Sequence, residues 1–438
     1  MTKDQIASME PALTEFVGKF GHCFVRDKTQ TYWVKYLAGL MADVTRKSIE
    51  PIALAAGVTV RTLQEFLSMY VWDHRRAEDT LQRLVAEEQR GVEGVGVVDS
   101  SGHPKQGDKT PGVQRQWCGQ IGKVDNCVVG QHLLYTDNDW SNPFSCMLAS
   151  DLYLPEGWAA DRERCREAGI PDELVYREKW RIAIGQIERA MGNGVRFSWI
   201  VFDEEYGRAP GFWLELDRLG QRGVGEVPKD FMCWTTPPAC QSLRPEHAAK
   251  EVGHLVRHSP VFTGQPWRKL KIKSTRRGRV FLKVKAARVQ LVAEAHDHRR
   301  APSVPTDRRY WLIVTENVQT GEVKYWVSNA PADADLEELL KIALSRWHVE
   351  QWFERAKQET GLGAFEVRTY TSLVRHWLSS RVAMLFLARQ TRRFRGEKSA
   401  DHLRASGSGG QCGGVEDLEA VSERLERADR RERVSSAA

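Results

Sequence analysis

The first part of the chain shows the apolar periodicity of helices. Apolar side chains recur at helical spacing through residues 32–41 and 49–70, and almost no strand pattern occurs before residue 90. Within the second stretch, Gly57 can supply a left-handed turn position, and Thr59 can cap a helix that follows it. The pattern therefore predicts an all-α N-terminal domain that contains two helices joined by a tight turn.

That helical pair has the layout of a helix-turn-helix, whose second helix shows its first residues to the bases of DNA. Arg61, Thr62 and Gln64 hold those positions here. An αα-hairpin inside a helical bundle gives the same pattern. DNA reading and simple packing therefore both remain open for this segment.

After Gly94 the pattern changes from helices to strands. Short apolar runs at 95–98 and 197–202 each end on an aspartate, Asp99 and Asp203. The segment 100–123 is rich in Gly, Lys and Gln and predicts a loop or an edge hairpin. Side chains at the carboxyl ends of strands in α/β sheets leave the core and face a crevice. Two aspartates at two strand ends therefore predict a chemical site.

The remaining pattern predicts an α/β protein built from segments of different character. Short strand patterns recur between residues 209 and 335, and helical periodicity returns through 336–358 and 373–389. The end of the chain mixes charges with a Gly/Ser stretch, which is typical of a weakly ordered tail. The predicted segments are 1–90, 91–208, 209–335, 336–392 and 393–438.

Composition narrows the class of protein. The chain has 438 residues, 28% of them charged, and a net charge of +6. No apolar run approaches the roughly 18 residues of a membrane span, and the first residues do not form a signal region. Its eight cysteines include no C-x-x-C pair, which favours reduced thiols over a zinc ribbon. We therefore expect a cytoplasmic protein that is not inserted in a membrane.

Positive charge is concentrated in one stretch without acids. A solvated surface normally mixes signs, so this stretch favours contact with a phosphate backbone over a plain solvated loop. A second set, Lys105, Arg115 and Lys123, is interleaved with glycines close to Asp99 and could line DNA or form a solvated hairpin. The acid-free stretch contains Arg268, Lys269, Lys271, Lys273, Arg276, Arg277, Arg279, Lys283, Lys285 and Arg288.

A later helical segment carries a carboxylate between two cations. At about 100° per residue, Arg346, Glu350 and Lys357 share one stripe. An ordinary salt-bridged helix has the same spacing. Together with Asp99 and Asp203, however, Glu350 completes the oxygen ligands of a two-metal site for phosphoryl transfer, which suits two Mg²⁺ ions, or Mn²⁺ in their place. The cations could then hold a phosphate, and Glu354 is the rival for the third carboxylate.

Several strings in the same order resemble the DDE transposases of bacterial insertion sequences, most closely the insertion-sequence-701 group, over residues 90–385. The signature Tyr-x2-Arg-x3-Glu-x6-Lys of the wider group is matched by Arg346, Glu350 and Lys357, while Ala343 stands at the tyrosine position. The strings are VVDSSGHPKQG, GVQRQWCGQIGKVDNCVVG, DLYLPEGW, FDEEYG and RWHVEQWFERAKQETGL.

This resemblance implies an RNase H-like fold, a mixed sheet flanked by helices and interrupted by a β-rich insertion. It implies that Asp99, Asp203 and Glu350 bind the metal ions and that Arg346 and Lys357 contact phosphates. It also implies a nucleoid-associated DNA transposase that acts on double-stranded DNA, with a homodimer in the DNA complex. A domesticated DNA-binding regulator and a nuclease that does not join strands remain the alternatives on this scaffold.

Overall fold

The computed structural model describes residues 8–44, 46–92, 94–139, 143–238, 244–275, 278–294 and 302–407. The chain forms two compact units, Met1–Ala388 and Arg389–Ala438. The first unit contains all the candidate residues of the predicted metal site. The predicted division into five segments stays a prediction.

Helices make up the regular structure before residue 90. The elements are α2 (Met9–Gly18), η1 (Gly21–Cys23), α3 (Asp27–Met41), α4 (Ile49–Ala55), α5 (Val60–Ser68) and α6 (His74–Glu88). Both features expected of the turn at residues 56–59, between α4 and α5, are confirmed. Gly57 has a φ of +64°, and the Thr59 side chain accepts a hydrogen bond from the backbone N–H of Thr62.

A 13-stranded mixed sheet forms the centre of the molecule. Its first half has the order β4-β3-β1-β5-β6, with β2 (Gln114–Cys118) pairing along the early part of β3. The strand β1 runs parallel to β5, and β5 runs parallel to β6, whereas β3 is antiparallel to both β1 and β4. These strands are β1 (Gly94–Pro104), β3 (Lys123–Thr136), β4 (Ser145–Leu152), β5 (Phe197–Phe202) and β6 (Gly223–Val227).

The sheet continues beyond β6 into strands from later in the chain. The strand β13 (Val323–Ser328) pairs antiparallel with β6, and β12 (Tyr310–Asn317) and β10 (Gly278–Glu294) follow. Short elements complete this half: β7 (Met232–Trp234), η2 (Pro245–His247), β8 (Lys250–Glu251), α12 (Val252–His258), α13 (Pro260–Thr263), β9 (Arg268–Thr275) and β11 (Val304–Pro305).

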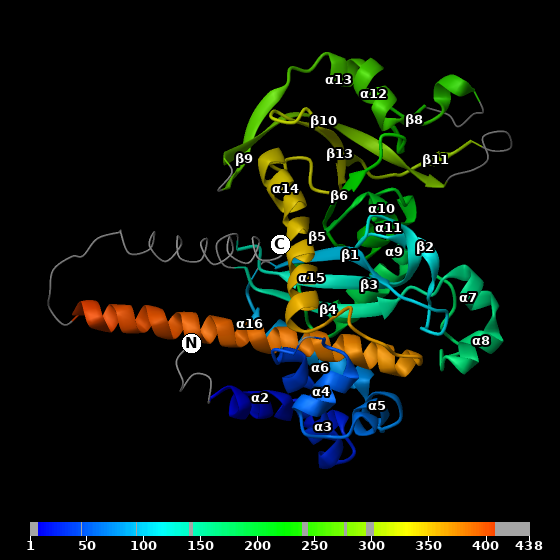
Figure 1. Ribbon diagram of the computed structural model, residues 1–438. Helices are drawn as coiled ribbons and strands as arrows, with labels where there is room; N and C mark the ends of the chain where they lie inside the picture. The colour runs from blue at the N-terminus through cyan, green and yellow to red at the C-terminus, as the bar shows by residue number, and fades with distance from the viewer. Residues whose placement is uncertain are drawn as a thin grey trace, which may run out of the picture. The chain divides into compact units, whose positions relative to one another are not determined.

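Helices cover both faces of the sheet (Figure 1). Residues of β1 alternate between the faces: Val98 packs in the core that contains α9 and α11, and Val97 packs in the core that contains α14 and α15. This alternation follows from the two-residue period of a strand. The helices are α7 (Glu156–Ala160), α8 (Arg162–Glu167), α9 (Lys179–Gly192), α10 (Glu204–Gly207), α11 (Pro210–Arg218), α14 (Leu336–Ala343), η3 (Leu344–Arg346), α15 (Trp347–Glu359) and α16 (Tyr370–Gly407).

The structure confirms the α/β class with a mixed sheet and corrects several predicted elements. Asp99 does not end its strand, because β1 continues to Pro104 through pairing with β3. For residues 100–123, where a loop or an edge hairpin is predicted, the edge hairpin is confirmed: β2 lies at the edge of the sheet and pairs antiparallel with the start of β3, although residues 100–104 still belong to β1. The strand pattern expected from residue 209 begins instead with the helix α11, and β6 then joins the first half of the sheet.

Two differences concern the C-terminal helices. The helix predicted over 336–358 is interrupted by the 3-10 turn η3, which separates α14 from α15. Helix α16 continues to Gly407, past the point where a tail is predicted, and residues 408–438 lie outside the described residues. Among the residues that the structure describes, no helix is both long and apolar enough to cross a membrane.

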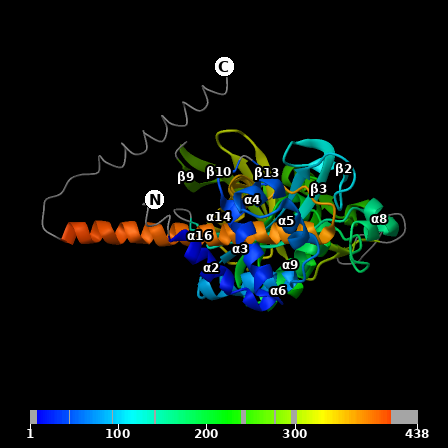
Figure 2. The ribbon, with the colours of Figure 1, turned by 60° about the horizontal axis from the view of Figure 1, so that its bottom comes forward.

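The first part of α16 lies beside the N-terminal helices (Figure 2). Arg375 donates hydrogen bonds to the carbonyl oxygens of Phe66, Leu67 and Trp72, at and beyond the end of α5. The next residue, His376, is 2.8 Å from the hydroxyl of Tyr36 on α3. Helix α16 therefore connects the N-terminal helices to the rest of the first unit.

Candidate active site

Asp99, on β1, lies next to Asp203, which directly follows the adjacent parallel strand β5. Val98 of β1 is paired with Phe202 of β5, so each aspartate directly follows a paired residue. An Oδ1 atom of Asp99 accepts a hydrogen bond of 2.7 Å from the backbone N–H of Ser100. The two carboxylates therefore meet because of the strand register, which brings together positions more than a hundred residues apart in the sequence.

The side chain of Asp203 is oriented by the short helix that follows it. Its Oδ1 atom accepts a hydrogen bond of 2.9 Å from the backbone N–H of Glu205 and so caps α10. A Cβ atom on Gly207 would clash with the carbonyl oxygen of Glu226 on β6. Glycine at this position therefore lets α10 pack closely against the sheet and fixes the direction of Asp203.

The positive charge near Asp99 and Asp203 does not balance the negative charge that their carboxylates would carry. Burial and the neighbouring charge of Asp203 raise the pKa of Asp99 to about 7, although Arg346 and the Ser100 N–H act in the opposite direction. Burial and the charge of Glu205 also raise the pKa of Asp203. Because desolvation and like-charge repulsion both disfavour the ionised pair, a cation bound at this position would stabilise it.

Arg346 connects Asp99 to Glu350. Its Nη1 atom lies 3.1 Å from Oδ2 of Asp99, and its Nη2 atom donates a hydrogen bond to Oε1 of Glu350. Glu354 is exposed, and the two carboxylate bonds of Arg346 go to Asp99 and Glu350. The predicted stripe thus reaches Asp99 through the guanidinium of Arg346, which ends η3 directly before α15, and this geometry favours Glu350 over Glu354 as the third carboxylate.

Lys357 is at the other end of the stripe and points deeper into the fold. Burial lowers the pKa of its ammonium, and its charge contributes to the lowered pKa values of the buried His103 and His132 on β1 and β3. Its Nζ atom is 6.0 Å from the ring centre of Phe353. Its phosphate-binding role stays a prediction.

A groove of about 670 Å³ opens beside the two aspartates. Three of its residues form a polar network that sequence reasoning missed: Lys179 Nζ is 2.6 Å from Glu205 and 3.4 Å from the hydroxyl of Ser100, which is itself 3.2 Å from Glu205. Glu205 stands in the FDEEYG string, which could have drawn attention to it, but Lys179 has no signal in the sequence. The groove is also lined by the aromatic residues Trp117, Tyr153, Tyr176 and Trp180.

The donor atoms of the site suit a hard divalent cation. Asp99, Asp203 and Glu350 offer carboxylate oxygens, the ligands that Mg²⁺ prefers, and the aspartates lack sufficient positive charge nearby. In the described part of the chain, no three His, Cys, Asp or Glu side chains converge closely enough to hold a metal ion. Glu350 is instead hydrogen-bonded to Arg346, which lies between Glu350 and Asp99. The carboxylate oxygens of these residues, and the short separation of Asp99 from Asp203, are therefore suited to a divalent metal ion.

The basic stretch forms an amphipathic hairpin of the antiparallel strands β9 and β10. On β9, Leu270 and Ile272 are buried and Lys269 and Lys271 are exposed, together with Arg268. Three of the cations have partners from outside the stretch: Lys283 pairs with Glu316 at 2.6 Å, Lys285 donates to the Phe262 carbonyl, and Arg288 donates to the Ala330 carbonyl. Lys273 and Arg279 belong to β9 and β10, and Arg276 and Arg277 lie outside the described residues.

The other predicted DNA contacts have varied surroundings. Lys105 donates to the carbonyls of Gly363 and Phe365, and burial lowers its pKa to about 8. Lys123 pairs with Asp125 at 3.1 Å, and Arg61 pairs with Glu65 at 2.7 Å. Arg115 is exposed on β2. Arg115 therefore stays on the surface, whereas Lys105 holds the loop after α15.

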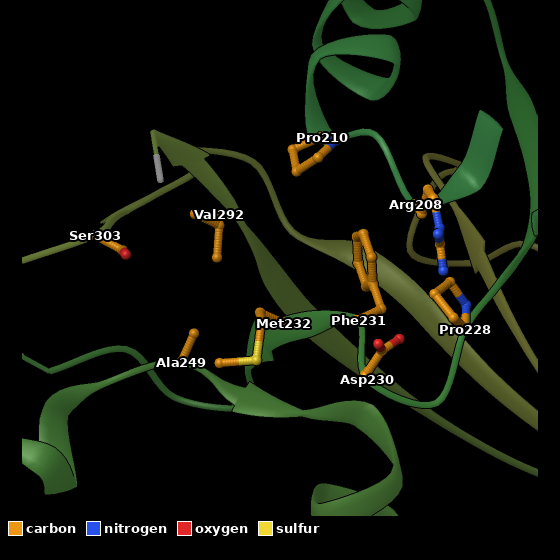
Figure 3. Close-up of a pocket in the computed structure, with 9 residues that line it drawn as sticks. All are labelled: Arg208, Pro210, Pro228, Asp230, Phe231, Met232, Ala249, Val292 and Ser303. Atoms are coloured by element: carbon orange, nitrogen blue, oxygen red, sulfur yellow. The ribbon is translucent and has the colours of Figure 1, made fainter. Parts of the chain in front are cut away.

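A second pocket, of about 320 Å³, borders the groove through Arg208, which lines both (Figure 3). Its walls include Phe231, Met232 and Val292, and Asp230 is the carboxylate among its lining residues. A metal site needs several converging oxygen donors. The groove with Asp99 and Asp203, and not this apolar pocket, is therefore the candidate active site.

Comparison with known proteins found a similar family and a similar protein. A family model described as "DDE superfamily endonuclease" matches residues 19–290, a range that contains Asp99 and Asp203 and ends before Glu350. The chain is also 24% identical over 344 residues to a protein from Microchaete diplosiphon named "Probable transposase for insertion sequence element IS701". That alignment covers 77% of each chain.

Proposed function

This chain belongs to the DDE superfamily of endonucleases, and we propose that it is a DNA transposase of the insertion-sequence-701 group. It binds the ends of its mobile element and cleaves and joins DNA strands by two-metal phosphoryl transfer. The observation that carries the proposal is the pair of Asp99, on β1, and Asp203, directly after the adjacent parallel strand β5, with Glu350 joined to Asp99 through Arg346.

The strand order supports an RNase H-like core. In the order β4-β3-β1-β5-β6, the antiparallel strands β4, β3 and β1 are followed by parallel β5 and β6. The first aspartate is on the first strand, and the second follows the neighbouring parallel strand. In this proposal the strands and short helices between β6 and α14 are the β-rich insertion, and the helices before residue 90 are the DNA-binding domain.

The residues of the site have distinct roles in the proposed reaction. Asp99, Asp203 and Glu350 hold two divalent ions, Mg²⁺ or Mn²⁺. When bound, these ions supply activation of the attacking water or 3′-hydroxyl and stabilisation of the leaving oxygen. Arg346 and Lys357 bind phosphate oxygens, since cations beside the carboxylates can hold the negative charge of the strand in line. The groove beside Asp99 holds the DNA strand.

The DNA substrate requires surfaces beyond this groove. Arg61 and Gln64 are exposed on α5, and Lys269 and Lys271 are exposed on β9. The cations Arg61, Lys269 and Lys271 can bind the phosphate backbone of DNA electrostatically, and the exposed face of α5 can enter the major groove. Because two element ends must be held together for strand transfer, the active complex is a homodimer on double-stranded DNA.

A strand-cleavage and strand-transfer assay on a cognate element end tests the proposal. We expect Asp99→Ala, Asp203→Ala and Glu350→Ala each to abolish Mg²⁺-dependent cleavage, while Glu354→Ala keeps it. Full activity in any of the first three variants would contradict the role of that residue. Cleavage without joining would identify a nuclease, and DNA binding with neither step would identify a regulator.

A further inference from the structure

The guanidinium of Arg346 occupies the space between two carboxylates that are proposed to bind metal. We propose that Arg346 is the internal counter-ion of the metal-free site and that a divalent ion must displace it from Asp99 and Glu350 in order to bind. This inference rests on the proposed function, because it concerns the same metal site.

Each carboxylate oxygen of Asp99 accepts a hydrogen bond. Its Oδ1 atom accepts from the backbone N–H of Ser100 at 2.7 Å, and its Oδ2 atom accepts from Arg346 at 3.1 Å. The side chain is only 13% exposed. The backbone bond is fixed by the strand, so the bond to Arg346 is the one that a metal ion would replace.

Glu350 is held in the same way but from a more open position. Its side chain is 54% exposed, and its Oε1 atom accepts from the other terminal nitrogen of Arg346. A guanidinium that uses two nitrogens for two different carboxylates acts as a bridge. It keeps Glu350 beside the aspartates without metal, and the same bridge prevents the three carboxylates from converging.

Arg346 has a route away from the carboxylates. Its side chain is 29% exposed, and the residue ends the 3-10 turn η3 directly before α15. A divalent ion at Asp99 would repel the guanidinium, whereas a phosphate could accept its planar pair of donors. The same side chain can therefore neutralise the acids before metal arrives and contact phosphate afterwards.

Binding of Mn²⁺ to the full-length protein without DNA tests this inference, with electron paramagnetic resonance and titration calorimetry as readouts at one fixed pH. We expect Arg346→Gln to bind Mn²⁺ at least about tenfold more tightly than wild type, because the competing charge is gone. Arg346→Lys keeps the charge but cannot bridge as a fork, so its affinity should fall between the two. Arg355→Gln, which removes an exposed arginine of the same helix, should match wild type.

The outcomes separate this inference from the proposed function. If Asp99→Asn removes Mn²⁺ binding but Arg346→Gln binds Mn²⁺ equally or more weakly than wild type, the counter-ion role is wrong while the metal site stands. If Mn²⁺ binding is undetectable in wild type and in all Arg346 variants, the proposed metal site is itself wrong. A thermal melt of each metal-free variant verifies that it is folded, and Arg346→Lys gives the answer if Arg346→Gln is not.

Discussion

Asp99 should make the metal-free protein less stable as the pH rises. Its pKa is about 7 in the folded protein, raised from the usual 3.8 by burial and by Asp203. The folded state therefore binds this proton more tightly than the unfolded state. The stabilisation is complete below about pH 4 and is lost as the pH rises through 7.

The magnitude follows from the difference between the two pKa values. A difference of about three pKa units at about 1.4 kcal/mol per unit gives about 4 kcal/mol for this group. Asparagine at position 99 cannot ionise, so Asp99→Asn removes the pH-dependent loss. The effect of Arg346 on the ionisation of Asp99 is already contained in the pKa of about 7. Costs of the Asp99→Asn exchange that do not depend on pH cancel in the comparison.

The assay is urea unfolding followed by tryptophan fluorescence, with a chelator present, at pH 4 and at pH 8. The free energy of unfolding of Asp99→Asn minus that of wild type should be about 4 kcal/mol larger at pH 8 than at pH 4, because only the wild type is destabilised at pH 8. Glu354→Gln, which removes an exposed acid of α15, is the control for loss of one charge. A difference below about 1 kcal/mol for Asp99→Asn, or one of opposite sign, would refute the reasoning.

Three further predictions test other parts of the structure. Arg375→Gln should lower the free energy of unfolding by about 3 kcal/mol, because a buried cation with three carbonyl acceptors is lost; an unchanged urea midpoint would contradict this. In DNA binding, Lys271→Gln should reduce the salt-dependence slope by about 0.9, whereas Lys283→Gln should not, since Lys283 is paired with Glu316; equal slopes would count against it. The Trp117 side chain is 62% exposed and lines the groove. Trp117→Ala should therefore weaken binding of a single-stranded oligonucleotide about tenfold through lost base stacking. Trp117→Phe, which keeps an aromatic ring, should bind about as tightly as wild type.

Local chemistry was predictable from the sequence wherever the interacting residues are close in the chain. Gly57 and Thr59 form the turn that their residue types favour. Arg346 and Glu350 meet because four residues make about one helical turn. The apolar runs before Asp99 and Asp203 also form strands, as expected.

Pairing across the sheet was not predictable in the same way. Nothing near Asp99 indicates that His132 lies opposite and extends the strand. The acid partner of Lys283 is on β12, and the carbonyl partners of Lys105 follow α15. A charge count along the sequence cannot reveal such partners, and the DNA contacts expected from the basic stretch stay a prediction.

Three consecutive residues of α16 face three different parts of the first unit. Arg375 holds the end of α5, His376 contacts Tyr36 on α3, and Trp377 packs against His103 and His132 of the sheet. Each helical step turns the side chain by about 100°. Inserting a single residue after Arg375 would rotate Arg375 by about 100° relative to His376 and Trp377, so the three contacts could not all form at once. The N-terminal helices are therefore bound to the catalytic sheet in a fixed angular phase and cannot be exchanged as a freely tethered module.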